Sequence, residues 1–425
     1  MKTEITTLPN KLKIVTCEMP GARSVSVSIL VAAGGRTEDF DTQGGASHFL
    51  EHILFKGTKN WPTAQQISGD IDAVGGLNNA YTSNDMTSFY IKLPKAHLGL
   101  ALDILADMIM NPLFDAEEID RERGVIIEEI NWRRHDDPMQ FVEVLLPPLL
   151  WPDDPLKQDV GGKDEVIRSI ERQTIIDYKE TFYQPGNMVV SVAGGAKHEE
   201  VVAQVKGLMG GLKAKAVPKI VPVRDRLSKD RTAIYTKPTA QAHFLIGSRA
   251  YPYLHKDDPA CGVLTTILGQ GMSSRLFLNV RERKGLAYSV NASRHNYVDT
   301  GIFEVYAGAN IEKTDEAIMA VLEELERIRL EPVPADELQK AKNKIRGGLQ
   351  MSLESNGNVA DRFGTQLLLL GKIRDVDETI ELVDAVTADD VQRVAADILA
   401  PKKLRMAIIA SDGSSAKLKF EELIG

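Results

Sequence analysis

Two histidines flank a glutamate in the string His48-Phe49-Leu50-Glu51-His52. Residues four apart on a helix lie roughly 40° apart around its axis, so both imidazoles can reach one ion while Glu51 lies on the adjacent edge. Two neutral imidazoles and one carboxylate form a three-ligand zinc set that leaves a fourth position open for water. A second carboxylate, which does not bind the ion, can take a proton from that water during attack on a carbonyl. The string therefore indicates a catalytic metal site with its own base.

The order of these residues reverses the His-Glu-x-x-His motif and is the inverzincin signature of zinc peptidases. One alternative is an ordinary helix with two surface histidines. A second alternative, a structural zinc site, is disfavoured because Glu51 would have no role in a closed four-ligand site.

The acidic stretch at residues 121–130 offers the carboxylate that would complete the metal site. It is predicted to be helical, with Asp115 as a cap and isoleucines along one face. Glu122 and Glu129 are seven residues apart and nearly superposed, whereas Glu128 points roughly 100° away. One carboxylate could bind the metal while another holds a histidine ring in place. Spacing alone does not choose between Glu128 and Glu129, and a solvated charged face is the alternative for the whole stretch.

The composition is that of a globular protein with more than one core. A chain of 425 residues with 43% hydrophobic and 26% charged residues is expected to form two or more domains. The net charge of -9 disfavours nucleic-acid binding and suits a chamber that receives neutral or basic peptides. A polar start and the lack of a long uncharged stretch favour a cytoplasmic protein without a membrane segment. Cys17 and Cys261 are expected to be small core residues.

The same order of predicted elements occurs twice along the chain. Hydrophobic patterning predicts, in the first half, a strand at 25–33, the helix with His48, a helix at 63–74, strands at 77–82 and 87–93, and helices at 96–110 and 116–134. The second half is predicted to hold a strand at 240–248, helices at 259–268 and 273–283, strands at 287–296 and 301–309, and helices at 314–329 and 335–355.

The segments that close the two halves match at a constant offset. Seven positions of the first segment correspond to positions of similar character in the second: Ile175, Tyr178, Phe182, Pro185, Met188, Val190 and Val192 align with Val391, Val394, Ile398, Pro401, Leu404, Met406 and Ile408. We expect an internal duplication of α+β units, with a metal-binding half at 1–212, a Lys/Pro-rich linker at 213–222 and a second half at 223–425. The alternative is that mixed α+β chains look alike at this level of detail.

The same offset places apolar residues where the first half has its candidate ligands. His48, Glu51 and His52 correspond to Leu264, Ile267 and Leu268. Only the first half is therefore expected to bind metal.

Several motifs together resemble the pitrilysin/insulinase family of zinc peptidases, most closely the short-chain branch of the mitochondrial processing peptidase subunits and their bacterial relatives. They span nearly the whole chain: residues 19–22 (MPGA), 44–52 (GGASHFLEH), 55–58 (FKGT), 79–82 (NAYT) and 271–277 (GMSSRLF). The resemblance implies an α+β fold of two homologous sandwich-like halves. Each half would be a mostly antiparallel sheet with helices packed on one face, and the two would form a clamshell.

The resemblance also implies the roles of the site residues. His48, His52 and Glu129 would bind one Zn²⁺ per chain, Glu51 would be the base, and Glu122 would be an outer-shell carboxylate.

The second half would contribute Arg281 and Tyr288, whose spacing in RERKGLAY matches an Arg and a Tyr that the family's catalytic chains use. A guanidinium can anchor a peptide carbonyl or carboxylate, and a phenol can donate to a tetrahedral oxyanion. A surface arginine and a core-edge tyrosine are the alternatives. Some family pairs divide the zinc motif and the Arg/Tyr pair between two chains, whereas this chain holds both. A homodimer is therefore expected, with a heterodimer with a paralogous chain as the alternative.

Substrate binding is expected at the strand with Asn79, Ala80, Tyr81 and Thr82, which resembles an edge strand that binds extended peptides. Phe49 is expected to line a substrate side-chain pocket, with a core position as the alternative. Together these residues predict a zinc-dependent endopeptidase that cleaves unfolded or extended peptides in a chamber. The alternative function is a non-catalytic scaffold or peptide-binding subunit of the same fold.

Overall fold

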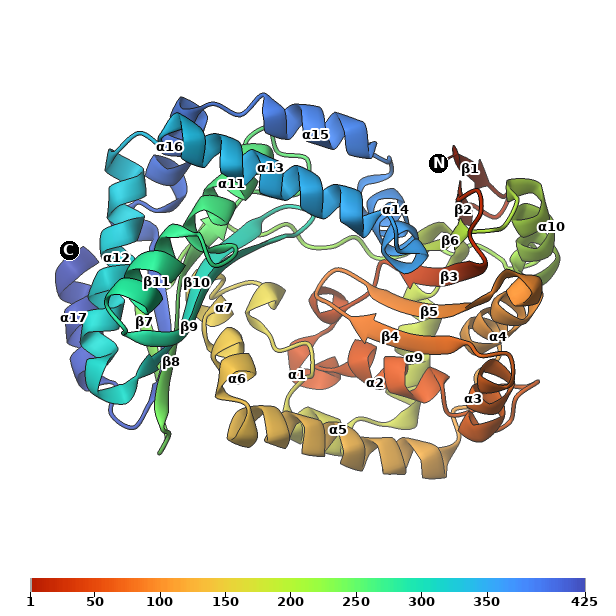
Figure 1. The fold of residues 1–425 in the computed structure, drawn as a ribbon. Helices are drawn as coiled ribbons and strands as arrows, with labels where there is room; N and C mark the ends of the chain where they lie inside the picture. The colour runs from red at the N-terminus through yellow and green to blue at the C-terminus, as the bar shows by residue number, and fades with distance from the viewer. Residues whose placement is uncertain (1, 425) are drawn as a thin grey trace. The chain divides into compact units, whose positions relative to one another are not determined.

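The structure, a computed structural model, describes residues 2–424 and contains two compact units, each built around one sheet (Figure 1). Unit 1 consists of Met1–Ile130, Gln158–Val221 and Gln350–Ile373, and unit 2 of Asn131–Lys157, Pro222–Leu349 and Arg374–Gly425. One boundary lies between Val221 and Pro222, within the predicted linker. Each unit also takes in a segment from the other half of the chain, an exchange that continuous domains at 1–212 and 223–425 do not include.

The sheet of unit 1 has six strands in the order β1-β2-β6-β3-β5-β4. Strands β2 and β6 pair in parallel, and all other neighbours are antiparallel. Strand β4 is at one end of the sheet and pairs only with β5 among the described residues. The strands are β1 (Lys2–Thr7), β2 (Lys13–Glu18), β3 (Ser24–Val31), β4 (Leu77–Thr82), β5 (Thr87–Pro94) and β6 (Met188–Gly194).

Helices cover both faces of this sheet. The larger layer holds the main core and consists of α1 (Phe40–Gln43), α2 (Ala46–Leu54), α3 (Ala64–Ala73), α4 (Leu98–Met110), α5 (Ala116–Asp136), α8 (Asp164–Ser169), α9 (Arg172–Phe182) and α10 (His198–Met209). On the other face, α14 (Asn356–Leu370) packs on β2, β3 and β6, and its residues Val359 and Phe363 belong to a small second core with Val15. The expectation of helices on one face alone therefore describes only the larger layer.

A glycine lets α14 approach the sheet closely. A Cβ atom on Gly364 would lie 2.6 Å from a methyl of Leu30 and 2.9 Å from the Cβ of Ser191. The Ser191 hydroxyl donates a hydrogen bond to the carbonyl of Ala360 at 2.6 Å. The blue helix α14 and the red and orange strands of unit 1, far apart in sequence, thus lie side by side (Figure 1).

The sheet of unit 2 repeats the strand order of unit 1. Its order β7-β11-β8-β10-β9 corresponds to β2-β6-β3-β5-β4, with the first pair parallel and the others antiparallel in both sheets. This shared topology confirms the predicted duplication. The strands are β7 (Thr232–Thr236), β8 (Gln241–Ala250), β9 (Ala287–Asn296), β10 (Gly301–Asn310) and β11 (Arg405–Ala410).

Unit 2 also has helices on both faces of its sheet. The larger core includes α11 (Asp258–Gly269), α12 (Thr314–Leu330), α16 (Ala388–Ile398) and α17 (Ser414–Ile424), with α13 (Ala335–Ser352) and α15 (Val376–Asp384) contributing at its edge. The smaller core contains α6 (Pro138–Leu145) and α7 (Pro147–Leu150), which come from the first half of the chain.

Two predicted helices differ in the structure. In place of the helix expected at 273–283, the chain forms a π-helical segment, η5 (Phe277–Arg283). The helix expected at 335–355 is two helices, because α13 ends at Ser352 and Ser355 caps a new helix, α14, by accepting from the backbone N–H of Asn358 at 3.4 Å.

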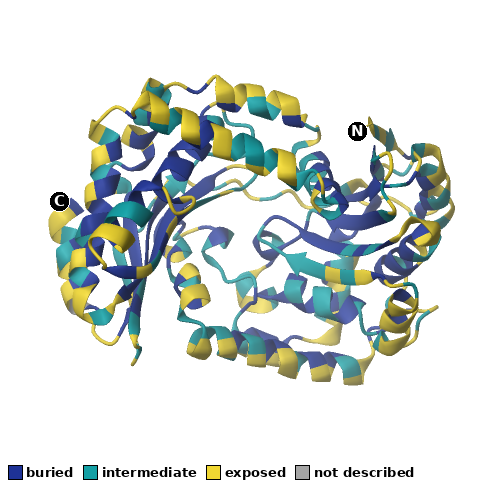
Figure 2. Cartoon of the chain, viewed as in Figure 1, coloured by how far each residue is buried: buried dark blue, intermediate teal, exposed yellow. Residues whose placement is uncertain are grey.

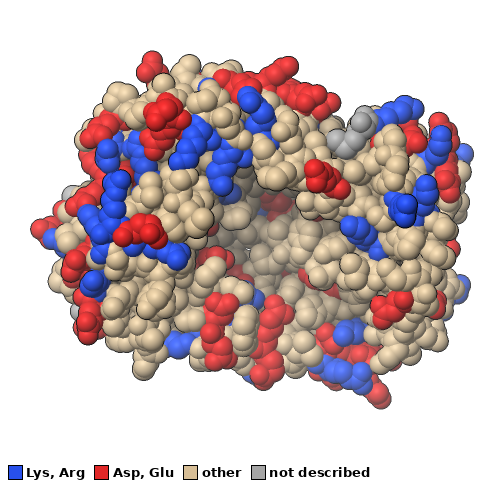
Figure 3. All heavy atoms as spheres, in the orientation of Figure 1, with Lys and Arg blue, Asp and Glu red and all other residues tan. Residues whose placement is uncertain are grey.

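Burial follows the amphipathic patterns from which the elements were predicted. The inner strands, such as β3, β6, β10 and β11, are almost wholly buried, whereas strands β1, β4 and β7 at the ends of the sheets are half-buried or exposed. Helices alternate between buried inner and exposed outer faces (Figure 2). Cys17 and Cys261 are both buried, as expected of core residues. Acidic and basic side chains are interspersed on the face drawn in Figure 3. No helix within residues 2–424 is long and apolar enough to cross a membrane.

Candidate metal centre

Helix α2, which carries both histidines, starts after Gly45, and the buried Glu38 side chain binds its first N–H groups. Gly45 has φ +94°, and a Cβ there would lie 2.9 Å from the carbonyl oxygen of Gly161. Glu38 accepts hydrogen bonds from the backbone N–H groups of Gly45 and Ser47, both at 2.7 Å, and from the Ser47 hydroxyl. Burial raises the pKa of Glu38 to about 7, while the hydrogen bonds from Ser47 and Gly45 oppose the rise. In either protonation state its oxygens can accept from N–H groups that are free at the start of a helix. Glu38 therefore fixes where the ligand helix starts.

The apolar face of α2 determines which side chains it presents to the site. Phe49, Leu50 and Ile53 are buried in the main core of unit 1. His48, Glu51 and His52 lie on the remaining face and are partly exposed. Packing of the three apolar residues thus directs the three chemically active ones away from the core.

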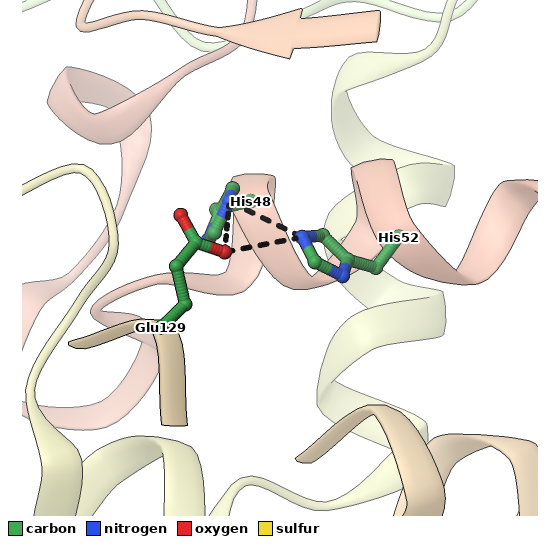
Figure 4. Close-up of side chains that lie close together, drawn as sticks. All are labelled: His48, His52 and Glu129. Carbon is green, nitrogen blue, oxygen red and sulfur yellow. Dashed lines mark hydrogen bonds and ion pairs between the residues drawn. The ribbon is translucent and has the colours of Figure 1, made fainter. Parts of the chain in front are cut away.

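Three donor atoms converge between α2 and α5. His48 Nε2 and His52 Nε2 are 3.3 Å apart, and each lies 3.8 Å from Glu129 Oε2 (Figure 4). A tetrahedral zinc ion with ligand distances of about 2.0–2.1 Å requires donors separated by about 3.3 Å. The histidine pair meets this spacing, and Glu129 needs to move by only about 0.5 Å, which its half-exposed side chain allows. Two imidazoles and one carboxylate also leave the fourth position open, so the residues fit a catalytic zinc ion.

Of the two glutamates that spacing left open, the structure brings Glu129 to the histidines. Among the described residues, His48, His52 and Glu129 are the one group of three or more potential ligands whose donor atoms lie within 4.8 Å of one another. Glu128 is exposed and outside this group.

Glu122 orients one of the imidazoles. Its Oε2 lies 3.0 Å from His52 Nδ1, and its Oε1 lies 2.6 Å from Lys56 Nζ. Although burial opposes it, the hydrogen bonds from His52 and Lys56 hold the pKa of Glu122 below its ordinary value. With Nδ1 donating to this carboxylate, Nε2 of His52 keeps its lone pair for a metal. This geometry is that expected of an outer-shell carboxylate.

Glu51 is held by Thr82, a residue that was expected to bind substrate. The Thr82 hydroxyl, on β4, donates to Glu51 Oε2 at 2.5 Å. Burial raises the pKa of Glu51, while the bond from Thr82 and the nearby His52 oppose the rise. No described residue makes a hydrogen bond to the second oxygen, Oε1, so it is available to a substrate or water molecule.

The expected contributors from the second half lie in unit 2. Arg281 is on the η5 segment, where its guanidinium stacks over the Phe277 ring at 4.8 Å. Tyr288 is at the start of β9 with 69% of its surface exposed. Their role in catalysis stays a prediction.

The substrate-binding residues divide into two groups. Asn79, Ala80, Tyr81 and Thr82 are on β4, an edge strand as predicted. Phe49, in contrast, has no exposed surface, and the Arg123 guanidinium lies over its ring at 5.6 Å. The expectation that Phe49 lines a substrate pocket is wrong, because its position on α2 directs it into the core.

Glu38 and Lys56 are site-supporting residues that the sequence reasoning missed. Lys56 is four residues after His52 but lies beyond the end of α2 at Leu54, and no periodic signal links Glu38 to the helix that it caps.

Comparisons with known proteins identify the family of this chain. A family model described as insulinase (peptidase family M16) matches residues 13–163, and one described as the peptidase M16 inactive domain matches residues 169–345. An uncharacterized zinc protease of Streptomyces coelicolor is 36% identical over 93% of this chain and 86% of its own length. One of Bacillus subtilis is 32% identical over 96% of this chain and 98% of its own length.

Solved structures share the fold. The crystal structure of a protease from Helicobacter pylori has a TM-score of 0.88 and 25% identity, covering 96% of this chain and 99% of that one. A peptidase M16 inactive domain from Pseudomonas fluorescens also has a TM-score of 0.88, with 18% identity over 97% of this chain and 99% of that one, and so supports the fold alone.

Proposed function

Because this chain belongs to the M16 (insulinase) family of peptidases, we propose that it is a zinc-dependent endopeptidase of the inverzincin type that cleaves extended peptides. The observation that carries the proposal is the convergence of His48 Nε2, His52 Nε2 and Glu129 Oε2 beside a carboxylate, Glu51, that is outside the ligand set. A structural site needs no such extra acid, whereas peptide hydrolysis does.

Each site residue of unit 1 has a distinct role in this proposal. His48, His52 and Glu129 would hold one zinc ion per chain, which would act as a Lewis acid that makes water acidic enough to lose a proton near neutral pH. Glu51 would accept the proton of the attacking water at Oε1 and later deliver it to the leaving amine. Glu122 would keep His52 in the tautomer and orientation that binding requires.

The open edge of strand β4 is an argument for a peptide as the substrate. Its outer edge has no partner strand among the described residues, so its N–H and C=O groups can pair with an added strand of any sequence. Thr82 on this strand bonds directly to Glu51, so a peptide added along β4 would run beside the base. We also propose that Arg281 and Tyr288 assist the reaction and that the chain acts as a homodimer, which the mass of the protein in solution would test.

Peptide digestion with mass spectrometry of the fragments tests the enzyme class. We expect internal cleavage that a chelator abolishes, that Glu51→Gln abolishes with zinc retained, and that readdition of zinc restores to the wild-type protein. A Glu51→Gln protein with verified zinc and normal turnover would remove Glu51 from its role as base.

The alternative is a non-catalytic scaffold or peptide-binding protein of the same fold. The inactive-domain model matches residues 169–345, which include Leu264, Ile267 and Leu268, the buried residues that correspond to His48, Glu51 and His52. The first half keeps all three donor residues and Glu51, so the enzyme is favoured. Zinc binding without any fragment production would favour the scaffold instead.

A further inference from the structure

Strand β4 carries two neighbouring hydroxyls that bind carboxylates on opposite faces of the sheet. Thr82 donates to Glu51 Oε2 and Tyr81 donates to Asp361 Oδ1, each at 2.5 Å. Side chains alternate along a strand, so Thr82 faces α2 while Tyr81 faces α14. Only the first of these bonds ends on a residue of the candidate metal centre.

The bond from Thr82 is the one hydrogen bond that the described residues make to the Glu51 side chain. His52 and Glu129 influence Glu51 through their charges, but neither hydrogen bonds to it. A glutamate has three rotatable side-chain bonds, so a single strong anchor decides where its carboxylate points. Since an ionised carboxylate can only accept, the Thr82 hydrogen must point at Oε2, which leaves Oε1 free.

A buried hydroxyl, that of Thr87, lies next to Thr82. The Thr87 Oγ1 atom is 3.5 Å from Thr82 Oγ1, is fully buried, and donates to the carbonyl of Ala33 at 2.8 Å. Contact with this buried side chain restricts the rotation of Thr82 and helps to hold its hydroxyl in place.

We propose that Thr82 is a positioning residue for catalysis: its hydroxyl fixes the Glu51 carboxylate with Oε2 anchored and Oε1 presented to the attacking water. The inference rests on the proposed peptidase function and on Glu51 as the base. It assigns to Thr82 a task separate from the binding of substrate by the β4 backbone. A misplacement of a reacting group by about 1 Å can lower a rate about 100-fold, so loss of this anchor should act on turnover.

The test is Thr82→Val in the full chain, which keeps the shape and β-branching of the side chain but removes the hydroxyl. We expect kcat for a peptide substrate to fall about 10- to 100-fold, with KM and the zinc content of the protein unchanged. Thr82→Ser restores a hydroxyl and should recover most of the wild-type kcat. Should the valine variant fold poorly, the comparison of Thr82→Ala with Thr82→Ser gives the same contrast.

The matched control is Thr16→Val on β2 of the same sheet. Thr16 is buried, and its hydroxyl bonds to His198 Nδ1 at 2.8 Å rather than to a residue of the site. Loss of this hydroxyl should leave kcat unchanged. An equal fall in kcat for both valine variants would mean that sheet stability is responsible, which would overturn the inference.

Parallel assay of Glu51→Gln separates the inference from the function on which it rests. An inactive Glu51→Gln protein together with a Thr82→Val protein of normal kcat would overturn the positioning role and leave the peptidase intact. A raised KM with normal kcat, or loss of zinc from Thr82→Val, would also overturn it. An active Glu51→Gln protein would overturn the role of the base and the inference together.

Discussion

The carboxylate of Glu122 should contribute measurably to zinc affinity. It is 3% exposed, and it bonds to His52 Nδ1 at 3.0 Å and to Lys56 Nζ at 2.6 Å. In Glu122→Gln the amide oxygen can still accept from one of these partners, but the amide nitrogen would face the other, and the negative charge would be lost. Outer-shell changes of this kind typically weaken metal binding about 10- to 100-fold, or about 1.4–2.7 kcal/mol.

Two contributions have to be separated, because Glu122 also forms an ion pair with Lys56. The ion pair should stabilise the metal-free and metal-bound protein alike, whereas the bond to His52 strengthens when the ring binds a cation. Lys56→Met removes the ion pair and keeps the bond to His52, so its zinc affinity should stay close to that of the wild type.

Competition with a chromophoric chelator measures both dissociation constants in the folded proteins. Circular dichroism of the metal-free variants checks that each has folded. The reasoning would be refuted if Glu122→Gln bound zinc as tightly as the wild type, or if Lys56→Met weakened binding as much as Glu122→Gln does.

Three further predictions concern the ligand set, its helix cap and the second core of unit 1. His52→Ala should lose both bound zinc, measured by elemental analysis, and peptide cleavage. Burial raises the pKa of Glu38 from 4.5 to about 7, so its contribution to stability is complete below about pH 4.5 and is lost as the pH rises through about 7. In denaturant titrations, the free energy of unfolding of Glu38→Gln should therefore rise by about 3 kcal/mol relative to that of the wild type between pH 4.5 and 8. A difference between the two proteins that stays constant with pH would contradict this. Gly364→Ala should lower the melting temperature by overpacking against Leu30, at a cost of about 1–3 kcal/mol, whereas Gly357→Ala in the same helix has room for its methyl group and should be neutral or stabilising.

The elements and the local site were predictable because their signals are short-range. Strands β4 and β9 have the predicted bounds, since alternation and flanking turn residues define them within a few positions. The four-residue spacing of His48 and His52 sufficed to place both rings on one helix face. The choice of Glu129 over Glu128 came from the family resemblance, because the spacing of the two residues along the chain does not show which side chain reaches α2.

The features that were missed depend on contacts between distant segments. The periodicity of residues 335–355 indicates one helix, whereas α14, which Ser355 caps, is a separate helix. Its packing on the sheet of unit 1 joins segments that are distant in sequence. Phe49 has the same side-chain chemistry as a pocket residue, and only the assembled core shows that it is completely buried. The π-helical turn that carries Arg281 likewise has no local sequence signal, since its composition is that of an ordinary helix.

The position of α14 has a consequence for how the chain acquires its structure during synthesis. The six strands of unit 1 are complete once residue 194 has been made, yet the helix that covers their second face ends at residue 370. The nascent chain must therefore carry an apolar surface that includes Val15 and Val189 while more than 160 further residues are translated. Chaperones that bind exposed apolar strands would be engaged during this interval, and a gene truncated after the linker should yield an aggregation-prone product rather than an independent metal-binding half.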